Sequence, residues 1–242
     1  MSNGKTAIME SNNRTAAIPS SYRKTSLTAG LLYLLTFVSI PTLAIYGAVK
    51  SANYILGAGP DTPAIIGAIL EIIVALAGIG TAVVLLPVLK KQNEGAALGL
   101  VAARILESST IFVGVAFLLS IVSLRQAGAG ADALSASHTL AVLYDRIFLL
   151  GQSFMPAICD LLLGFLLYKS RLVPRGLSLI GIVGAAPLVA GYLAILFGLI
   201  GQHAPLAGLF AIPVAIFEFS LGVWLVFKGF NPKAVAALES KQ

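Results

Sequence analysis

Six runs of apolar residues, each long enough to cross a lipid bilayer as a helix, dominate the sequence. A spanning helix needs about 20 predominantly apolar residues. Polar or turn-forming segments separate the runs, and none shows the alternating pattern of a barrel strand. The six predicted spans are 26–49, 62–89, 95–124, 144–168, 176–200 and 205–227. We therefore expect an all-α polytopic membrane protein, a bundle of six transmembrane helices within residues 26–230.

Composition excludes most other classes of protein. Hydrophobic residues make up 58% of the chain and charged residues 11%, whereas a soluble domain carries roughly 25% charged residues. A soluble domain of this size has too little interior for so much apolar sequence. This argues against a soluble enzyme, a disordered chain and a nucleic-acid module. The net charge of +6 fits basic loops beside anionic lipid, so membrane lipid, not nucleic acid, is the expected partner.

The basic residues fall mostly on one side of the predicted spans. The other side holds only Lys50 and Arg125, while Arg104 and Arg146 lie within spans. Because cytoplasmic loops carry an excess of Lys and Arg, we expect both termini in the cytoplasm and the protein in the inner (plasma) membrane. The residues on the cytoplasmic side are Lys5, Arg14, Arg23, Lys24, Lys90, Lys91, Lys169, Arg171, Arg175, Lys228, Lys233 and Lys241.

The segments outside the spans are short. Residues 1–25 are mostly polar and are expected to form a disordered cytoplasmic tail, and residues 231–242 a cytoplasmic C-terminal tail. The first apolar run is expected to be a retained helix, with a signal sequence cleaved near Ser51-Ala52 as the alternative. The outer loops are predicted at 50–61, 125–139 and 201–204. Pro41, Pro156, Pro187 and Pro213 lie inside spans, where each should kink or break a helix.

Several charged residues lie inside the predicted spans. Glu71, Arg104, Glu107 and Glu218 fall within roughly one or two helical turns of the bilayer midplane, and Asp160 lies nearer the inner end of the fourth span. Each charge near the bilayer centre costs about 2.5–3.5 kcal/mol on insertion scales. These five residues are therefore the candidates for a ligand, proton or ion site.

Arg104 and Glu107 are three residues apart, so they share a helix face and can form an intrahelical pair. Glu71 and Glu218 have no partner in their own helices. Either one of them completes a network with Arg104 across the bundle, or each is protonated. Two interpretations of the cluster stay open at this point. It is either a binding site at the midplane or a buried polar network that only fixes the register of the helices.

A second set of polar residues lies near the outer ends of the spans. His138 and His203 fall in predicted outer loops, and Tyr144, Asp145 and Arg146 mark the predicted outer end of the fourth span. A His/His/Asp metal site is an alternative, but the spacing matches no ligand motif, and no metal is expected. Tyr144-Asp145-Arg146 is expected to cap and anchor that end, and the alternative is that these residues, with His138 and His203, are candidates for a functional site on the outer side. The single cysteine, Cys159, lies in an apolar run and is expected to be a packed hydrophobe.

Four segments resemble a bacterial family of six-helix membrane proteins catalogued as domain of unknown function 4386. They are the Ala-Gly-Leu-Leu-Tyr-Leu run at 29–34, Ala-Arg-Ile-Leu-Glu at 103–107, Gly-Phe-Leu-Leu-Tyr-Lys-Ser at 164–170 followed by Leu-Val-Pro-Arg at 172–175, and Glu218 with Trp224-Leu225 and Lys228-Gly229-Phe230. At Gly176 the chain departs from the family, which more often has a large residue such as Trp there. The resemblance implies six helices and draws attention to Arg104, Glu107 and Glu218. It supplies no reaction, substrate or cofactor.

Three classes of function are compatible with these features. The first is a binding or transport module for an ion or a small cationic or amphipathic molecule, with the Glu/Arg cluster as its site. The second is a structural or accessory subunit of a larger membrane complex, because the loops are minimal and the helix faces apolar. The third is an intramembrane enzyme that uses the carboxyl groups as acid and base. No nucleophile, metal or cofactor motif supports the third, so we expect no cofactor and rank binding or transport first.

Overall fold

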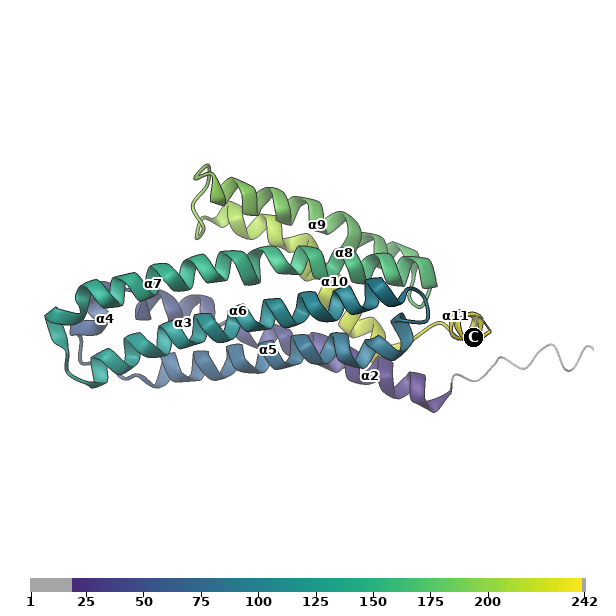
Figure 1. The fold of residues 1–242 in the computed structure, drawn as a ribbon, viewed down its shortest axis with the longest axis horizontal. Coiled ribbons are helices and arrows are strands. Elements are labelled where there is room, and N and C mark those ends of the chain that lie inside the picture. Colours follow the sequence, from purple (N-terminus) through teal and green to yellow (C-terminus); the bar gives the residue numbers. More distant parts are fainter. Residues whose placement is uncertain (1–18, 241–242) are drawn as a thin grey trace, which may run out of the picture.

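The computed structural model describes residues 19–240, and every regular element within that range is helical (Figure 1). Six segments are long and apolar enough to cross a membrane, so the chain is a multi-pass membrane protein with the predicted all-α fold. The elements are α2 (Ser20–Leu35), η1 (Thr36–Ser39), α3 (Thr42–Val49), α4 (Ala52–Leu56), α5 (Thr62–Leu89), α6 (Glu94–Gln126), η2 (Gly130–Ala133), α7 (Leu134–Phe148), η3 (Leu149–Phe154), α8 (Met155–Ser170), α9 (Arg175–Leu196), α10 (Pro205–Phe227) and α11 (Pro232–Glu239).

The predicted spans 62–89 and 205–227 coincide with α5 and α10. The first span begins earlier than predicted, at Ser20, because Tyr22 and Ser26 are buried in the bundle. Residues 20–25, expected to be disordered, are therefore helical, and the rest of that predicted tail up to residue 18 lies outside the described residues. The fifth span ends at Leu196, where Phe197 and Gly198 close the helix.

The prediction for the segment before the fourth span is wrong. We expected a loop over residues 125–139, but α7 begins at Leu134 and continues through η3 and α8 as one helical segment up to Ser170. The inward face of this stretch is buried at helical spacing, by Ala133, Ser137, Ala141 and Tyr144. His138 and its polar neighbours occupy the exposed face. Polar residues on the outer face of an amphipathic helix therefore account for the error.

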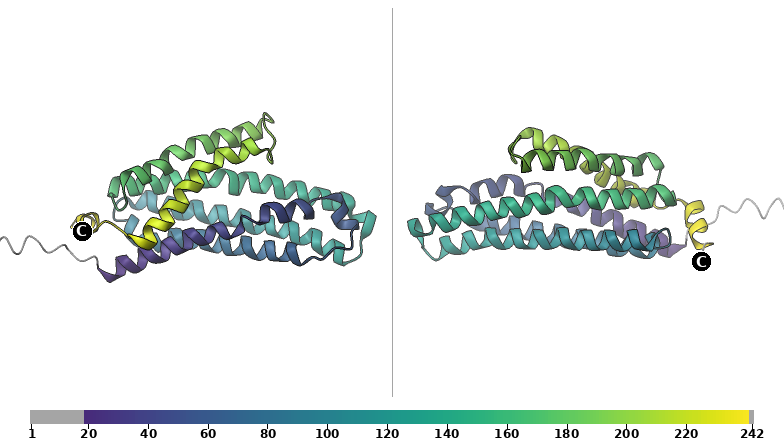
Figure 2. Two further views of the ribbon diagram at one scale, coloured as in Figure 1. Left: turned by 180° about the vertical axis from the view of Figure 1, so that it is seen from behind. Right: turned by 45° about the horizontal axis from the view of Figure 1, so that its top comes forward.

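The helices form one elongated bundle with a shorter hairpin on its flank (Figures 1 and 2). The long helices α5, α6 and α7–α8 run side by side, with α2 packed against α5. The hairpin consists of α9 and α10, which pack against each other, and it contacts the bundle through α8 and α2. We call the end where α2 begins and α11 lies the tail end, and the end formed by α4 and the α6–α7 connection the distal end.

The prolines interrupt the helices in two places next to the hairpin. In the first span, α2 gives way to the 3-10 turn η1, and α3 begins only after Pro41, which has no N–H to continue the helix. In the fourth span, the π-helical turn η3 precedes Pro156, which lies in the first turn of α8. Helices α9 and α10 continue through Pro187 and Pro213. The breaks in two spans therefore face the region where the hairpin leaves the bundle.

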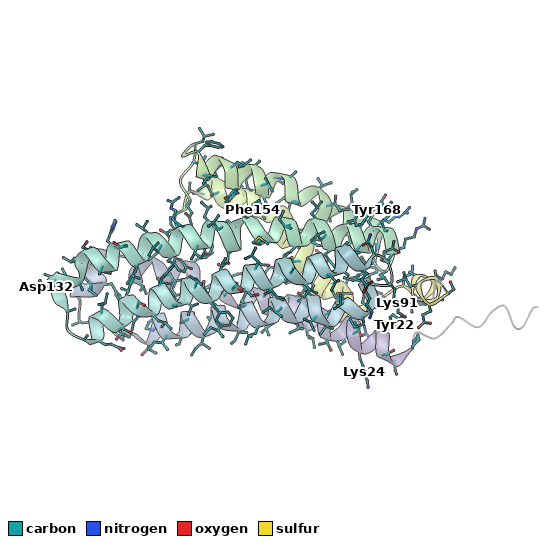
Figure 3. The ribbon with its side chains drawn as sticks, viewed as in Figure 1. Tyr22, Lys24, Lys91, Asp132, Phe154 and Tyr168 are labelled. Carbon is teal, nitrogen blue, oxygen red and sulfur yellow. The ribbon has the colours of Figure 1, made fainter. Side chains whose placement is uncertain are left out.

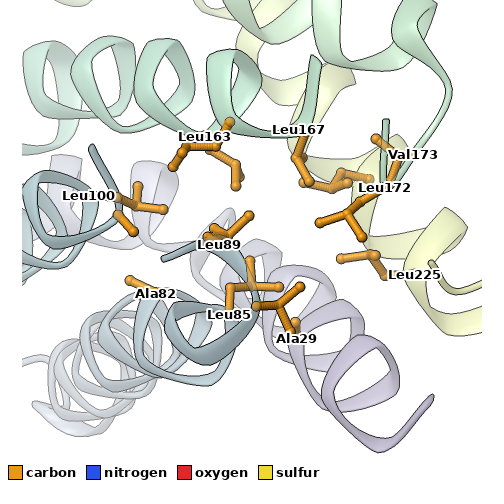
Figure 4. Packing of buried hydrophobic residues seen from close by; sticks show 14 of the residues in the cluster. Ala29, Ala82, Leu85, Leu89, Leu100, Leu163, Leu167, Leu172, Val173 and Leu225 are labelled. Carbon is orange, nitrogen blue, oxygen red and sulfur yellow. The ribbon is translucent and has the colours of Figure 1, made fainter. Parts of the chain in front are cut away.

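The largest of the hydrophobic clusters of buried residues lies toward the tail end. Leucine side chains from four helices meet there, and Leu172 and Val173 reach in from the α8–α9 turn (Figure 4). The C-terminal stretch, expected to be a tail, adds α11 to this core, because Val235 and Leu238 are buried. The backbone N–H of Asn231 donates to the carbonyl of Leu172 at 2.9 Å. The turn before α11 is thereby joined to the α8–α9 turn.

Candidate functional site

Charged side chains from three helices meet around Arg104. Its Nη1 lies 2.9 Å from Oε2 of Glu107 on the same helix, α6, and its Nη2 lies 2.5 Å from Oε1 of Glu218 on α10. Asp160 on α8 places Oδ1 at 3.8 Å from the same Nη2. The structure thus contains the intrahelical pair predicted from the spacing. Of the two alternatives for Glu218, the structure has the one in which Glu218 pairs with Arg104 across the bundle.

A close helix crossing brings Glu218 to Arg104. A Cβ atom added at Gly30 of α2 would lie 2.8 Å from the carbonyl oxygen of Gly222 on α10 and 2.8 Å from the backbone N of Val226. Because Gly222 lies one helical turn beyond Glu218, this approach holds Glu218 inward. Tyr33 of α2 is buried beside the cluster, with its ring centroid 5.7 Å from the Cζ atom of Arg104. Helix α2 therefore contributes both the glycine crossing and an aromatic wall.

The cluster has an unequal number of acids and bases. One guanidinium faces three carboxyl groups, so the four groups carry a formal charge of −2 when all are ionised. Asp160 is completely buried, and neither of its carboxyl oxygens has a hydrogen-bond partner among the described residues. The side chains of Glu107 and Glu218 keep 11% and 14% of their surface accessible. Glu107 and Glu218 are therefore the acids that a ligand could reach.

A cavity of about 440 Å³ opens onto this cluster between the hairpin and the bundle. Arg104, Glu107 and Glu218 form its charged end. Its walls come from the break in the first span, from the π-helical turn η3 and from the hairpin, and they are largely apolar. Among the polar groups are Gln152 and Tyr192. The interrupted helices thus line the space that the charged residues face, as expected where irregular backbone borders a cavity.

Glu71 does not join the Arg104 cluster. Tyr144 of α7 donates its hydroxyl to Oε1 of Glu71 at 3.1 Å, and the ring of Tyr46 stands edge-on to Tyr144 at 5.5 Å between centroids. The hydroxyl of Tyr46 and Oε2 of Glu71 are buried without hydrogen-bond partners among the described residues. Gln152 lines both the large cavity and the small void beside Glu71. The Glu71 group therefore borders the cavity as a separate polar pocket.

A third polar group connects α3, α7 and the turn between α9 and α10. Lys50 lies 2.6 Å from Asp145, and His203 lies 3.7 Å from the same carboxylate. Gln202 donates its side-chain N–H to the carbonyl of Asp145 at 2.9 Å. His138 is exposed on α7 and forms no hydrogen bond or ion pair with this group in the described part of the chain. The three polar residues Tyr144-Asp145-Arg146 lie inside α7 rather than at a helix end, which corrects the predicted capping role. Arg146 is exposed.

Asp61, at the start of α5, forms a further group at the distal end. The carboxylate accepts hydrogen bonds from the Tyr54 hydroxyl at 2.7 Å and the Gln126 amide at 3.0 Å, and it pairs with Arg125. Burial opposes ionisation of Asp61, but the two hydrogen bonds and the charge of Arg125 outweigh it and hold its pKa below the usual range. Burial and the hydrogen bond to Asp61 raise the pKa of Tyr54 to about 12. The group joins α4, α5 and α6.

Three residues of these groups, Lys50, Gln152 and Tyr46, were not predicted from the sequence to belong to a site. Gln152 had a visible signal, because it is a polar residue inside the apolar stretch 147–151 and 154–159. Lys50 was identified only as a rare basic residue on its side of the membrane. Tyr46 carries no sequence signal of its own, since a tyrosine near a span end is common at membrane interfaces.

Comparison with known proteins gives a family but no relative of known activity. No curated protein and no solved structure matches the chain. The family model described as "Domain of unknown function (DUF4386)" matches residues 28–229, which include every member of the Arg104 cluster and the whole cavity lining. The chain is thus a six-span helical membrane protein that belongs to the DUF4386 family.

Proposed function

We propose that this protein binds a small cationic molecule with an apolar body in the cavity beside Arg104. The observation that carries the proposal is the charge imbalance at the charged end of an otherwise apolar space. Glu107 and Glu218 retain accessible surface there, and only one guanidinium is shared among three carboxyl groups. A cation at this end would offset the excess negative charge in a medium of low dielectric constant.

The cavity has the dimensions and the lining of a ligand site. Its volume of about 440 Å³ falls within the range of roughly 300–1,000 Å³ that is common for small-molecule pockets. Phe37, Ile111 and Phe148 provide apolar wall, and Gln152 and Tyr192 add neutral hydrogen-bonding groups. A ligand with one positive charge and an apolar body would match both parts. Transport of such a ligand would require this binding step first.

The binding test uses tetraphenylphosphonium, a lipophilic cation, and the purified full-length chain in mild detergent. We expect saturable binding by equilibrium dialysis, and a Glu218→Gln variant should bind about 10–100-fold more weakly, because it loses an interaction of roughly 1.5–3 kcal/mol with a charged partner. Glu94→Gln is the matched control, since Glu94 is exposed in the first turn of α6 and does not line the cavity. Equal affinities of the two variants would contradict the proposal.

A second variant separates loss of the cavity from disturbance of the ion pairs. Gly208 lines the cavity, and a Cβ atom placed there meets nothing within 4 Å. Gly208→Phe should therefore fill space in the cavity and prevent binding while the Arg104 cluster stays intact. Gly47→Phe on α3 is the control, because Gly47 is exposed and lies outside the cavity lining.

The accessory-subunit hypothesis is tested by native mass spectrometry of the protein released in mild detergent without delipidation. Our proposal expects the chain alone, or copies of it, with a discrete small-molecule mass that is absent from Gly208→Phe. Recovery in a stable complex with other polypeptides, with the cavity free of small molecules, would favour the accessory-subunit hypothesis instead.

A further inference from the structure

Five basic residues surround two adjoining hollows at the tail end, far from the Arg104 cavity. One hollow, of about 440 Å³, lies between the α8–α9 turn and the α10–α11 turn and is lined by Arg171, Arg175 and Lys228. The other, of about 380 Å³, lies against α11 and is lined by Lys169, Arg171 and Lys233. Arg171 and Asn231 belong to both linings, so the two hollows form one basic site. Tyr168 and Lys91 mark this end in Figure 3.

These cations form no ion pair with an acidic side chain of residues 19–240. Of the described residues, none that lines either hollow is acidic. The guanidinium of Arg175 instead stacks over the ring of Tyr168, 4.8 Å from its centroid. An unpaired group of five cations favours an anion from outside the chain.

The backbone around the site is fixed by buried residues. Arg171 adopts a left-handed conformation with φ 59°, and the two residues after it, Leu172 and Val173, are buried in the tail-end core. The N–H of Asn231 donates to the carbonyl of Leu172, so the two turns that line the larger hollow are bonded to each other. The basic side chains therefore project from a preformed frame rather than from loose tails.

The site lies where the apolar helix α9 begins and the apolar helix α10 ends, the depth at which we expect lipid headgroups to begin. The apolar span of α9 starts after Arg175, and that of α10 ends at Phe227, directly before Lys228. Trp224, whose indole N–H donates to the carbonyl of Gly229 at 3.1 Å, lies in the last turn of α10, and tryptophan is enriched at membrane interfaces. Exposed apolar side chains of α9 and α10, including Val183 and Phe227, continue from the site into the membrane-spanning region. A ligand here would meet positive charge at one end and an apolar helix face at the other.

We propose that this basic site binds the phosphate group of an anionic phospholipid, with the acyl chains lying along α9 and α10. Arg171, Arg175 and Lys228 hold the phosphate, and the geometry of the two turns positions them. This inference does not depend on the proposed cation-binding function, because the two sites share no lining residue.

The test measures the retention of phosphatidylglycerol by the purified full-length protein, using native mass spectrometry and thermal unfolding in detergent. Phosphatidylcholine and inorganic phosphate are added in parallel as a neutral lipid and a soluble phosphate. The test variant is Arg171→Gly with Lys228→Gln, because glycine adopts the left-handed conformation of position 171 without strain. The control is Lys24→Gln with Lys90→Gln, which removes the same charge from exposed residues at the same end that line neither hollow.

We expect phosphatidylglycerol to bind and stabilise the wild-type protein and the control, and to bind the test variant about 25-fold more weakly, at about fivefold per basic residue. An equal loss of phosphatidylglycerol binding in the control variant would show only a general attraction between the basic protein and anionic lipid, and it would overturn the proposal. If phosphatidylcholine bound as tightly as phosphatidylglycerol, the negative charge of the headgroup would have no role in binding. Equal stabilisation by inorganic phosphate would overturn the assignment to a lipid. The variant Arg175→Gln provides an independent check, and full retention of the lipid by both variants would also refute the site.

Discussion

Arg104 shares its guanidinium among carboxyl groups on α6, α8 and α10. Replacing it by glutamine would leave three acids, of which Glu107 and Asp160 are buried, without a cation. We expect Arg104→Gln to lower the free energy of unfolding by about 3–5 kcal/mol, the usual cost of breaking a buried pair from one side. Unfolding in mixed micelles measures this. Arg146→Gln, at an exposed position of α7, should change stability by about 0.5 kcal/mol or less. A similar loss in both variants would contradict the central role of Arg104.

Asp61 makes the stability of the distal end depend on pH. Its folded-state pKa is lowered, so its contribution is fully present above the ordinary aspartate pKa of about 3.9 and is lost as the pH falls through the lower folded value. We expect wild type to exceed Asp61→Asn in thermal stability at pH 6, with the difference shrinking below about pH 4. Unfolding temperatures in detergent between pH 3 and pH 7 measure it. A difference that stays constant with pH would refute the assignment.

At the scale of elements, the contact between α2 and α10 determines where the charged residues of α10 lie. Gly30 and Gly222 let the two helix backbones approach each other one turn beyond Glu218, a common role for small residues in membrane helices. The same two helices separate toward the distal end, where the first span breaks at Pro41 and the cavity opens. The first span thus contains both a close crossing, which brings α10 near, and a helix break, which borders the open cavity.

Gly30→Ala tests this crossing. The added Cβ would contact backbone atoms of α10 at 2.8 Å, and backbone cannot rotate away as a side chain can. We expect a loss of about 1–3 kcal/mol in unfolding free energy, typical of overpacking, and weaker tetraphenylphosphonium binding, because Glu218 moves. Gly47→Ala has open space around its Cβ and should be neutral or stabilising by up to about 1 kcal/mol. Unchanged stability and binding in Gly30→Ala would contradict a close approach.

At the scale of the whole molecule, most basic residues of the described chain lie at the tail end, on or beside α2, α5, α8, α9, α10 and α11, and this predicts its orientation. From the positive-inside rule we expect the tail end to lie in the cytoplasm. We expect Lys233→Cys to react with a membrane-impermeant maleimide only in permeabilised cells, and Ser135→Cys, exposed on α7 at the distal end, to react in intact cells. The native Cys159 is buried and should give no background. The opposite labelling pattern would contradict this prediction and show that the distal end lies in the cytoplasm.

The sequence predicts the elements better than it predicts their contacts. Continuous apolar runs bounded by charged or turn-forming residues predict the bounds of α5 and α10, because these helices end where the apolar sequence ends. The pairing of Arg104 with Glu107 follows from helical spacing within one element. The contacts of Asp160 with Arg104 and of Glu71 with Tyr144 depend on which helices become neighbours and how they rotate. That information lies in side-chain packing across the bundle, such as the Gly30 crossing, and has no local sequence signal.

The unequal lengths of the helices have a consequence for the surrounding lipid. Helix α5 has 28 residues and α9 has 22, so at 1.5 Å per residue they measure about 42 Å and about 33 Å. The hydrocarbon core of a bilayer is about 30 Å thick. Tilting the molecule cannot match both flanks at once, because the helices are packed together. The protein therefore faces a graded hydrophobic mismatch around its circumference, with thicker lipid favoured beside α5 and α6 and thinner lipid beside the hairpin.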